Sequence, residues 1–140
     1  MPVYRDKIKL STSGYCDIHD ITAEVSGILK KSGLNQGICC VAAVGSTSAV
    51  STIEFEPGLL KDIPRFFESL LPDDVPYEHD KTWGDGNGFS HMRSFLLKTS
   101  ASIPFNDGKL DLGTWQQIVY LDFDNRSRRR EITVQLVGEK

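Results

Sequence analysis

Ile38-Cys39-Cys40-Val41-Ala42-Ala43-Val44 is a continuous apolar run of strand length, and Gly37 and Gly45 flank it. Such a run is typical of a strand that is buried on both faces at the centre of a sheet. We therefore expect a central strand here, and we place the other elements of the fold around it.

Two elements are expected before this strand. Apolar and polar residues alternate over residues 3–12, which predicts a first strand. A helix follows, because Asp20 is a suitable N-cap and Gly33 lies where a left-handed C-cap belongs. The apolar stripe of this helix consists of Ile21, Val25, Ile28 and Leu29.

A second main helix is expected after the central strand. Pro64 lacks a backbone N–H and fits only near a helix start, so regular helix should begin around residues 61–63 and stop at Pro72. We expect its apolar stripe to be core, and a short strand near Tyr77 to follow. The stripe consists of Leu59, Leu60, Ile63, Phe66, Phe67, Leu70 and Leu71.

The last part of the chain is β-rich after a short helix over residues 89–97. Residues 100–105 and 110–123 are expected to pair as a hairpin, because Asn106-Asp107-Gly108-Lys109 between them is a turn signal. A last strand is expected over residues 131–137. Helices and strands occur without a regular βα alternation, so the predicted class is α+β, as a single domain over residues 1–140.

The composition limits the classes of function. The chain has 140 residues, of which 39% are hydrophobic and 25% charged, as is ordinary for a globular domain. Its net charge of −3 argues against broad binding of nucleic acid, which requires a basic surface. No apolar run approaches the roughly 20 residues of a membrane helix, so we expect no membrane partner.

The N-terminus and the cysteines favour a cytoplasmic protein. Residues 1–7 carry charges where a signal peptide would have its apolar core. The three cysteines, with Cys39 and Cys40 adjacent, do not resemble a disulfide framework. Neighbouring strand positions face opposite sides, so these two thiols are not expected to share a metal. We expect buried free thiols.

Residues 77–91 are the first candidate for a functional site. They contain two of the three histidines of the chain, together with carboxylates and closely spaced glycines. Histidine and carboxylate beside such a turn are the side chains that bind divalent metals near neutral pH. We therefore expect His79, His91 and Asp85 to be metal ligands, with Glu54 as the second choice of carboxylate. The alternative for Asp85 is a role as a turn or helix cap.

Further polar residues are candidates for anion binding. Ser46 and Thr47 follow the central strand, where hydroxyls and backbone N–H groups can bind phosphate or carboxylate; local side-chain-to-backbone bonds are the alternative. Asn87 lies before the short helix, whose N-terminus favours an anion. Arg129 belongs to a group of arginines that is either an anion clamp or a solvated edge.

A family resemblance appears at Leu110-Asp111-Leu112-Gly113-Thr114-Trp115-Gln116-Gln117-Ile118. Together with the upstream elements given below, this signature resembles the YjbQ family, over most of the chain. The upstream elements are Ser46-Thr47, Glu54, His79-Asp80, Gly84-Asp85-Gly86-Asn87, His91, residues 96–100 and Ser102-Ile103-Pro104. The resemblance implies a mostly antiparallel sheet with two main helices and one short helix, assembled as a homotrimer.

The resemblance also implies an activity and a cofactor. Members of this family are largely uncharacterised, and some are described as secondary thiamine-phosphate synthases, which join a pyrimidine diphosphate to a thiazole phosphate with loss of pyrophosphate. Zinc, or another divalent metal such as magnesium, is the cofactor expected at the family level. Many bacterial relatives have a His-Thr-Thr triplet where this chain has Gly45-Ser46-Thr47, so one family ligand is absent if that histidine binds metal.

Gln116, Glu54 and Asp85 are the expected catalytic side chains. Trp115 is expected in the core of a strand, and Gln116 on the opposite face, where it can bind a ligand or orient a metal-bound water. The expected substrate is a small phosphorylated molecule. Two alternatives to thiamine-phosphate synthesis remain: a metal-dependent hydrolase of a small phosphorylated or acylated compound, and a non-catalytic metal- or anion-binding module.

Overall fold

A five-stranded antiparallel sheet with the predicted central strand in its middle is the largest element of the computed structural model, which describes residues 1–140. The strand order is β1-β8-β3-β5-β6. The strands are β1 (Val3–Thr12), β3 (Gln36–Ala43), β5 (Ser100–Asn106), β6 (Lys109–Leu110) and β8 (Arg128–Glu139). The first strand has the predicted bounds. The last strand begins earlier than predicted, because residues 128–130 pair with β1 instead of forming a connection.

The prediction that the central strand is buried on both faces is wrong. Cys39, Val41 and Ala43 are buried, but Ile38 is 55% exposed and Cys40 is half-buried. Side chains alternate between the faces of a strand, so one face of β3 contributes to the core and the other does not. The reason is that residues of helix α1 and of a second sheet share one core cluster with the first face, whereas the other face is exposed or half-buried in the single chain.

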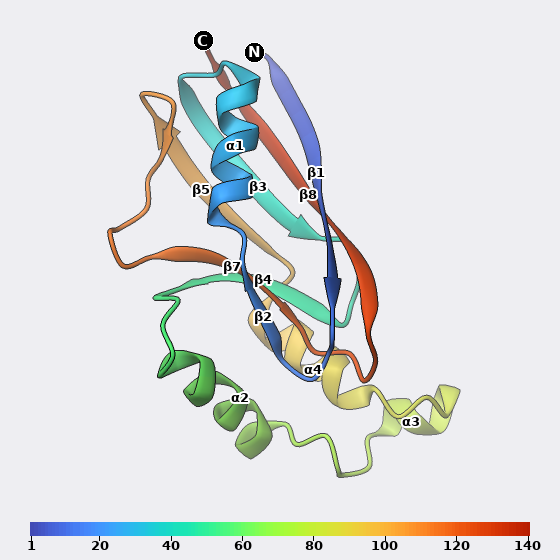
Figure 1. The fold of residues 1–140 in the computed structure, drawn as a ribbon. Coiled ribbons are helices and arrows are strands. Elements are labelled where there is room, and N and C mark those ends of the chain that lie inside the picture. The colour runs from blue at the N-terminus through green and yellow to red at the C-terminus, as the bar shows by residue number, and fades with distance from the viewer.

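The second sheet has three antiparallel strands in the order β2-β7-β4. They are β2 (Asp17–Asp20), β7 (Gln117–Asp122) and β4 (Ser48–Ile53). The predicted hairpin turn at residues 106–109 is present, but residues 110–123 do not form one strand. After β6 the chain leaves the large sheet and enters the second one (Figure 1). Trp115 lies in the connecting turn and is 74% exposed, so its predicted place in the core is wrong.

Helix α1 (Thr22–Ser32) covers the large sheet and matches its prediction closely. The predicted stripe is buried, and Gly33 adopts the left-handed conformation with φ 70°. The predicted N-cap is wrong by one residue: Ile21 occupies that position. Asp20 precedes it, and its carboxylate accepts a hydrogen bond of 3.0 Å from the Thr22 backbone N–H.

Three further helices lie at the end of the sheets opposite to the two chain termini (Figure 1). Helix α2 (Leu59–Leu70) begins before the predicted residues 61–63, because the Glu56 carboxylate accepts hydrogen bonds from the Gly58 and Leu59 N–H groups and starts the helix there. Pro64 therefore lies inside it. The predicted core stripe is only partly buried: Phe67 is buried, whereas Phe66 and Leu70 are mostly exposed.

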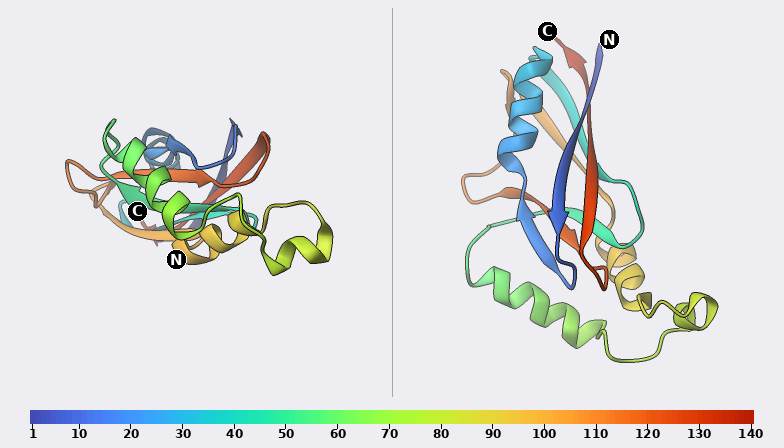
Figure 2. Two further views of the ribbon diagram at one scale, coloured as in Figure 1. Left: turned by 90° about the horizontal axis from the view of Figure 1, so that it is seen from below. Right: turned by 45° about the vertical axis from the view of Figure 1, so that its right-hand side comes forward.

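Helix α3 (Glu78–Trp83) replaces the predicted strand and loop around Tyr77, and α4 (Gly88–Leu97) confirms the predicted short helix. The Asp80 carboxylate stabilises both: it accepts hydrogen bonds from the Tyr77 N–H at 3.3 Å and from the Gly88 N–H at 2.9 Å. Figure 2 shows α3 at the periphery, beyond α4. None of the helices combines the length and apolar composition that a membrane span requires.

A buried ionic network joins the two sheets near α4. The carboxylates of Asp122 and Asp124, at the end of β7, are fully buried. Arg130 of β8 donates to Asp122 at 2.7 and 2.9 Å, and Arg128 contacts Asp124 at 2.6 Å. A buried charge costs several kcal/mol unless it is paired, so these arginines offset the cost of burying the two acidic side chains.

Replacing Arg130 with methionine should destabilise the fold strongly. The change leaves the Asp122 carboxylate buried and without its bidentate partner, which should lower the free energy of unfolding by about 3–5 kcal/mol. Arg129→Met is the matched control, because the Arg129 side chain is exposed on the other face of the same strand; its effect should be within about 0.5 kcal/mol. Urea unfolding of both variants measures the difference, and equal losses would contradict this role of Arg130.

Candidate functional site

His79 and His91 lie side by side although they come from different helices. Their ring centroids are 4.2 Å apart, with His79 on α3 and His91 on α4. The connection between these helices turns sharply at Gly84 and Gly86. Their φ values of 69° and 68° lie in the left-handed region that residues with a side chain disfavour. The fold therefore brings together the two histidines that the sequence separates.

Two carboxylates complete this histidine cluster. The His79 Nδ1 atom lies 3.9 Å from a carboxylate oxygen of Asp80 and 3.9 Å from one of Asp85. One ligand atom from each of these three residues lies within 4.8 Å of the others, as in a site that can hold a metal ion. Nδ1 of His79 is buried and has no hydrogen-bond partner, so this nitrogen is free to bind.

The surroundings of His91 favour its neutral form. Burial lowers the pKa of the His91 imidazole below its ordinary value of 6.5, and the neighbouring His79 lowers it further. The carboxylates of Asp124 and Asp85 oppose this shift but do not cancel it. A neutral imidazole is the form that binds metals or accepts a proton, so His91 is available for either near neutral pH.

Asn87 connects the histidine cluster to the buried ionic network. It is buried immediately before α4, and its Nδ2 donates to Asp124 at 3.3 Å. Its Oδ1 atom is buried without a partner. Asn125 makes a second connection, because its Nδ2 donates to the Asp85 backbone oxygen at 2.8 Å. The turn that carries Asp85 is thus attached to the end of β7.

Ser46 and Thr47 have different surroundings. Thr47 is buried, and its hydroxyl accepts from Arg130 at 2.8 Å and contacts Asp124 at 3.4 Å, so it belongs to the ionic network. Ser46 is exposed and lines an open pocket of about 430 Å³, of which His91 is also a lining residue. Of the two predicted anion-binding hydroxyls, only that of Ser46 is accessible.

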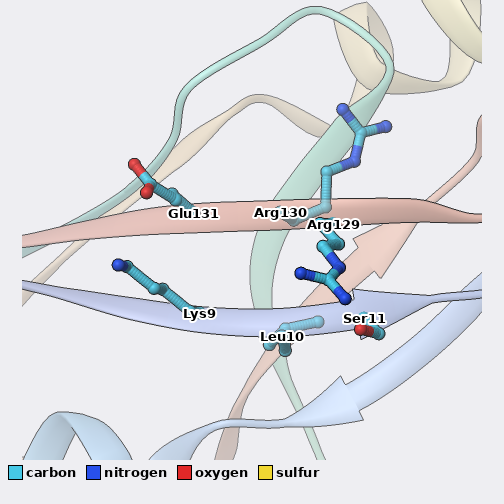
Figure 3. Close-up of a pocket in the computed structure, with 6 residues that line it drawn as sticks. All are labelled: Lys9, Leu10, Ser11, Arg129, Arg130 and Glu131. Carbon is cyan, nitrogen blue, oxygen red and sulfur yellow. The ribbon is translucent and has the colours of Figure 1, made fainter.

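Arg129 lies away from these hydroxyls. It lines a separate hollow of about 500 Å³ over β1 and β8, with Lys9, Ser11 and Glu131. Figure 3 shows Arg129 and Arg130 on opposite sides of β8. Sequence reasoning singled out Arg129 and missed Arg130, Asp122 and Asp124. The alternation of Ile132, Val134 and Leu136 was the available signal, because continuing it backwards places Arg130 and Arg128 on the inward face.

Gln116 and Glu54 lie at the other end of the second sheet. In the β4–β7 register Ser48 is opposite Asp122, near the histidines, whereas Ile53 is opposite Gln117. A strand of this length spans roughly 17–20 Å. Gln116 precedes β7 and bonds Thr52 at 3.1 Å and the Gly113 N–H at 3.0 Å, and Glu54 is exposed. Within one chain these two residues are therefore not brought together with Asp85.

Comparisons with known proteins all find similarity to one protein family over nearly the whole chain. Residues 6–139 match a family model described as UPF0047 protein YjbQ-like. A UPF0047 protein of Methanothermobacter thermautotrophicus is 40% identical, over 99% of this chain and 95% of its own length. A crystal structure of a protein of unknown function from Sulfolobus solfataricus is 33% identical, with a TM-score of 0.92 and 99% of each chain covered. One from Aeropyrum pernix is 30% identical, with a TM-score of 0.90, covering 96% of this chain and 98% of that one.

Removing the His79 ring should raise the pKa of His91. His79→Asn takes away a neighbour that disfavours the imidazolium form of His91, so the pKa of His91 should move towards 6.5 while staying lowered by burial. Titration of the His91 ring protons by NMR measures the change, with His19→Asn as the control, because His19 pairs with Asp17 instead. A His91 pKa that does not change in the His79 variant would contradict the coupling of the two rings.

Proposed function

The chain belongs to the YjbQ-like UPF0047 family, and we propose that it is a divalent-metal-dependent enzyme acting on a small phosphorylated molecule. One observation carries this proposal: the buried, unpartnered Nδ1 of His79 lies 3.9 Å from the carboxylates of both Asp80 and Asp85. A histidine nitrogen in a purely structural role usually has a hydrogen-bond partner when it is buried.

The donor set fits zinc better than magnesium. A histidine nitrogen with two carboxylate oxygens is a set that zinc accepts with a fourth position open, whereas magnesium prefers oxygen ligands and keeps its waters. His79, Asp80 and Asp85 would hold the metal, and His91 stands beside it as a further ligand or as a proton acceptor. When bound, the metal would supply a positive charge that stabilises a departing phosphate or pyrophosphate.

Thiamine-phosphate synthesis is the reaction we propose to test first. In it the thiazole nitrogen forms a bond to the pyrimidine methylene carbon, while the bond from that carbon to the diphosphate oxygen breaks and pyrophosphate leaves with the electron pair. The protein needs no nucleophile of its own for this step. Its residues must hold two phosphorylated substrates and exclude water, and the pocket beside His91 has room for a phosphate group.

Gln116 and Glu54, the other predicted catalytic residues, lie far from His79 within one chain. Because they lie at the far end of β4 and β7, they can act on the same substrate as His79 only if they belong to a neighbouring copy of the chain. We accordingly propose a homotrimer in the cytoplasm, where the free thiols of Cys16, Cys39 and Cys40 would stay reduced.

The open face of the large sheet is the candidate surface for this assembly. Val3, Val137 and Ile38 form one row across three strands, and all three are substantially exposed. Exposed apolar rows of this kind commonly mark protein–protein contacts. Light scattering should therefore give a mass about three times 15.6 kDa, and Ile38→Glu should reduce it, because the row would carry a charge at the interface. A monomeric wild-type protein would contradict this proposal.

Loss of His79 should abolish metal binding and turnover together. We expect about one tightly held divalent ion per chain by elemental analysis, and its loss in His79→Ala. His91→Ala should lose turnover, and its metal content shows whether His91 is a further ligand or the proton acceptor. His19→Ala is the matched control, because it removes the third histidine, which lies on β2 outside the cluster. Unchanged metal content in the His79 variant would contradict the metal centre.

The same variants separate the possible reactions. Wild-type enzyme with the metal should release pyrophosphate from the pyrimidine diphosphate only when the thiazole phosphate is present, and His79→Ala should lose this rate by at least about a hundredfold. Release of phosphate or pyrophosphate by water, without the thiazole, would replace the synthase with a hydrolase. Metal binding without any turnover would replace the enzyme with a binding module.

A further inference from the structure

The pocket beside His91 contains a cation without a counterion. Its polar lining includes Ser46, Thr99 and Lys98, and none of its lining residues is acidic. Lys98 forms no ion pair with any carboxylate; its ammonium group lies only over the ring of Phe95, at 5.7 Å from the centroid. The arginines of the buried ionic network differ, since Arg128 and Arg130 each contact a buried carboxylate.

The backbone of Lys98 is strained. Its φ of 83° and ψ of 156° fall in a region that is essentially restricted to glycine. Three hydrogen bonds hold the chain there: Lys98 N–H donates to Ser94 O at 2.9 Å, Val50 N–H to Lys98 O at 3.3 Å, and Ala43 N–H to Thr99 O at 2.8 Å. These bonds fix the junction of α4 with both sheets. A glycine would relieve the strain, so a lysine at this position costs folding free energy.

The loop opposite Lys98 offers further donors. The backbone N–H groups of Gly45, Ser46 and Thr47 donate to no acceptor within the protein. Gly45 and Ser46 line the same pocket as Lys98. Consecutive free N–H groups, together with a hydroxyl and an ammonium group, are the donors that bind phosphate oxygens in proteins.

We infer that Lys98 binds the phosphate group of a phosphorylated substrate, with Ser46 and the N–H groups of its loop, and so positions the reacting part of that substrate at His91 and His79. This inference rests on the proposed phosphate chemistry of the same site, and it adds the residue that selects a dianionic group. The selected class is a small phosphate ester or diphosphate. An uncharged analogue would leave the Lys98 ammonium group unpaired.

Calorimetric titration with inorganic phosphate and with pyrophosphate tests this assignment. Lys98→Met keeps the apolar stem of the side chain and removes its charge, so it should weaken binding of both anions about tenfold. Lys98→Arg should retain binding. Lys109→Met is the control for the loss of one exposed lysine, because Lys109 lies on β6 and does not line the pocket; it should bind both anions as the wild type does.

Lys98→Gly separates the strain from the binding. It should melt at or above the wild-type temperature, because glycine accepts the Lys98 backbone conformation, and it should lose anion binding as Lys98→Met does. Wild-type affinity for both anions in Lys98→Met would overturn the assignment. Metal content measured on the same samples distinguishes the two proposals. Anion binding that depends on Lys98, in protein that takes up no metal, would support the role of Lys98 and contradict only the proposed metal centre.

Discussion

The pairing of Arg130 and Arg128 with two buried carboxylates is the interaction on which the rest of the structure depends. Asp122 and Asp124 end β7 in the second sheet, and the arginines belong to β8 of the first, so the pairs hold the two sheets together at one end. Two buried charged groups are costly unless each has its partner. The pairs therefore fix the relative position of the two sheets at this end more specifically than hydrophobic contacts alone would.

The same carboxylates also position the candidate site. Burial raises the pKa of Asp124, but hydrogen bonds from the Asn125 N–H, Arg128 and Asn87 outweigh it and hold the pKa below the ordinary value of 3.8. The stabilising contribution of Asp124 is therefore present above that value and is lost as the pH falls below it. Through Asn87 it anchors the start of α4, and through Asn125 the turn with Asp85, so the site is held by the core and not by loops alone.

Local signals predicted much of the fold. The alternation of β1, the stripe of α1 and the glycine at its C-cap are decided within a few residues, and each element formed as predicted. The departures arose from distant contacts. Residues 110–123 read as one strand, yet the chain changes sheet after Leu110; the apolar run of β3 read as doubly buried, although only one layer covers it. Nothing local to either segment shows how many layers the fold will stack.

The candidate site, like the fold, was predicted where a local signal exists and missed where its residues come together through distant contacts. The density of histidine, carboxylate and glycine in residues 77–91 marked the region, and the structure brings His79 and His91 to 4.2 Å. Arg130 and Asp124 were not found, because their role depends on a pairing between strands, and Lys98 was not found because its signal is a backbone conformation.

The most direct test of the proposed metal centre is anomalous diffraction at the zinc edge from crystals of the zinc-treated protein. A zinc ion held by this site should give one strong peak at about 2.0–2.2 Å from His79 Nδ1 and from the carboxylates of Asp80 and Asp85. No peak between these residues, in crystals whose pH leaves histidine neutral, would contradict it.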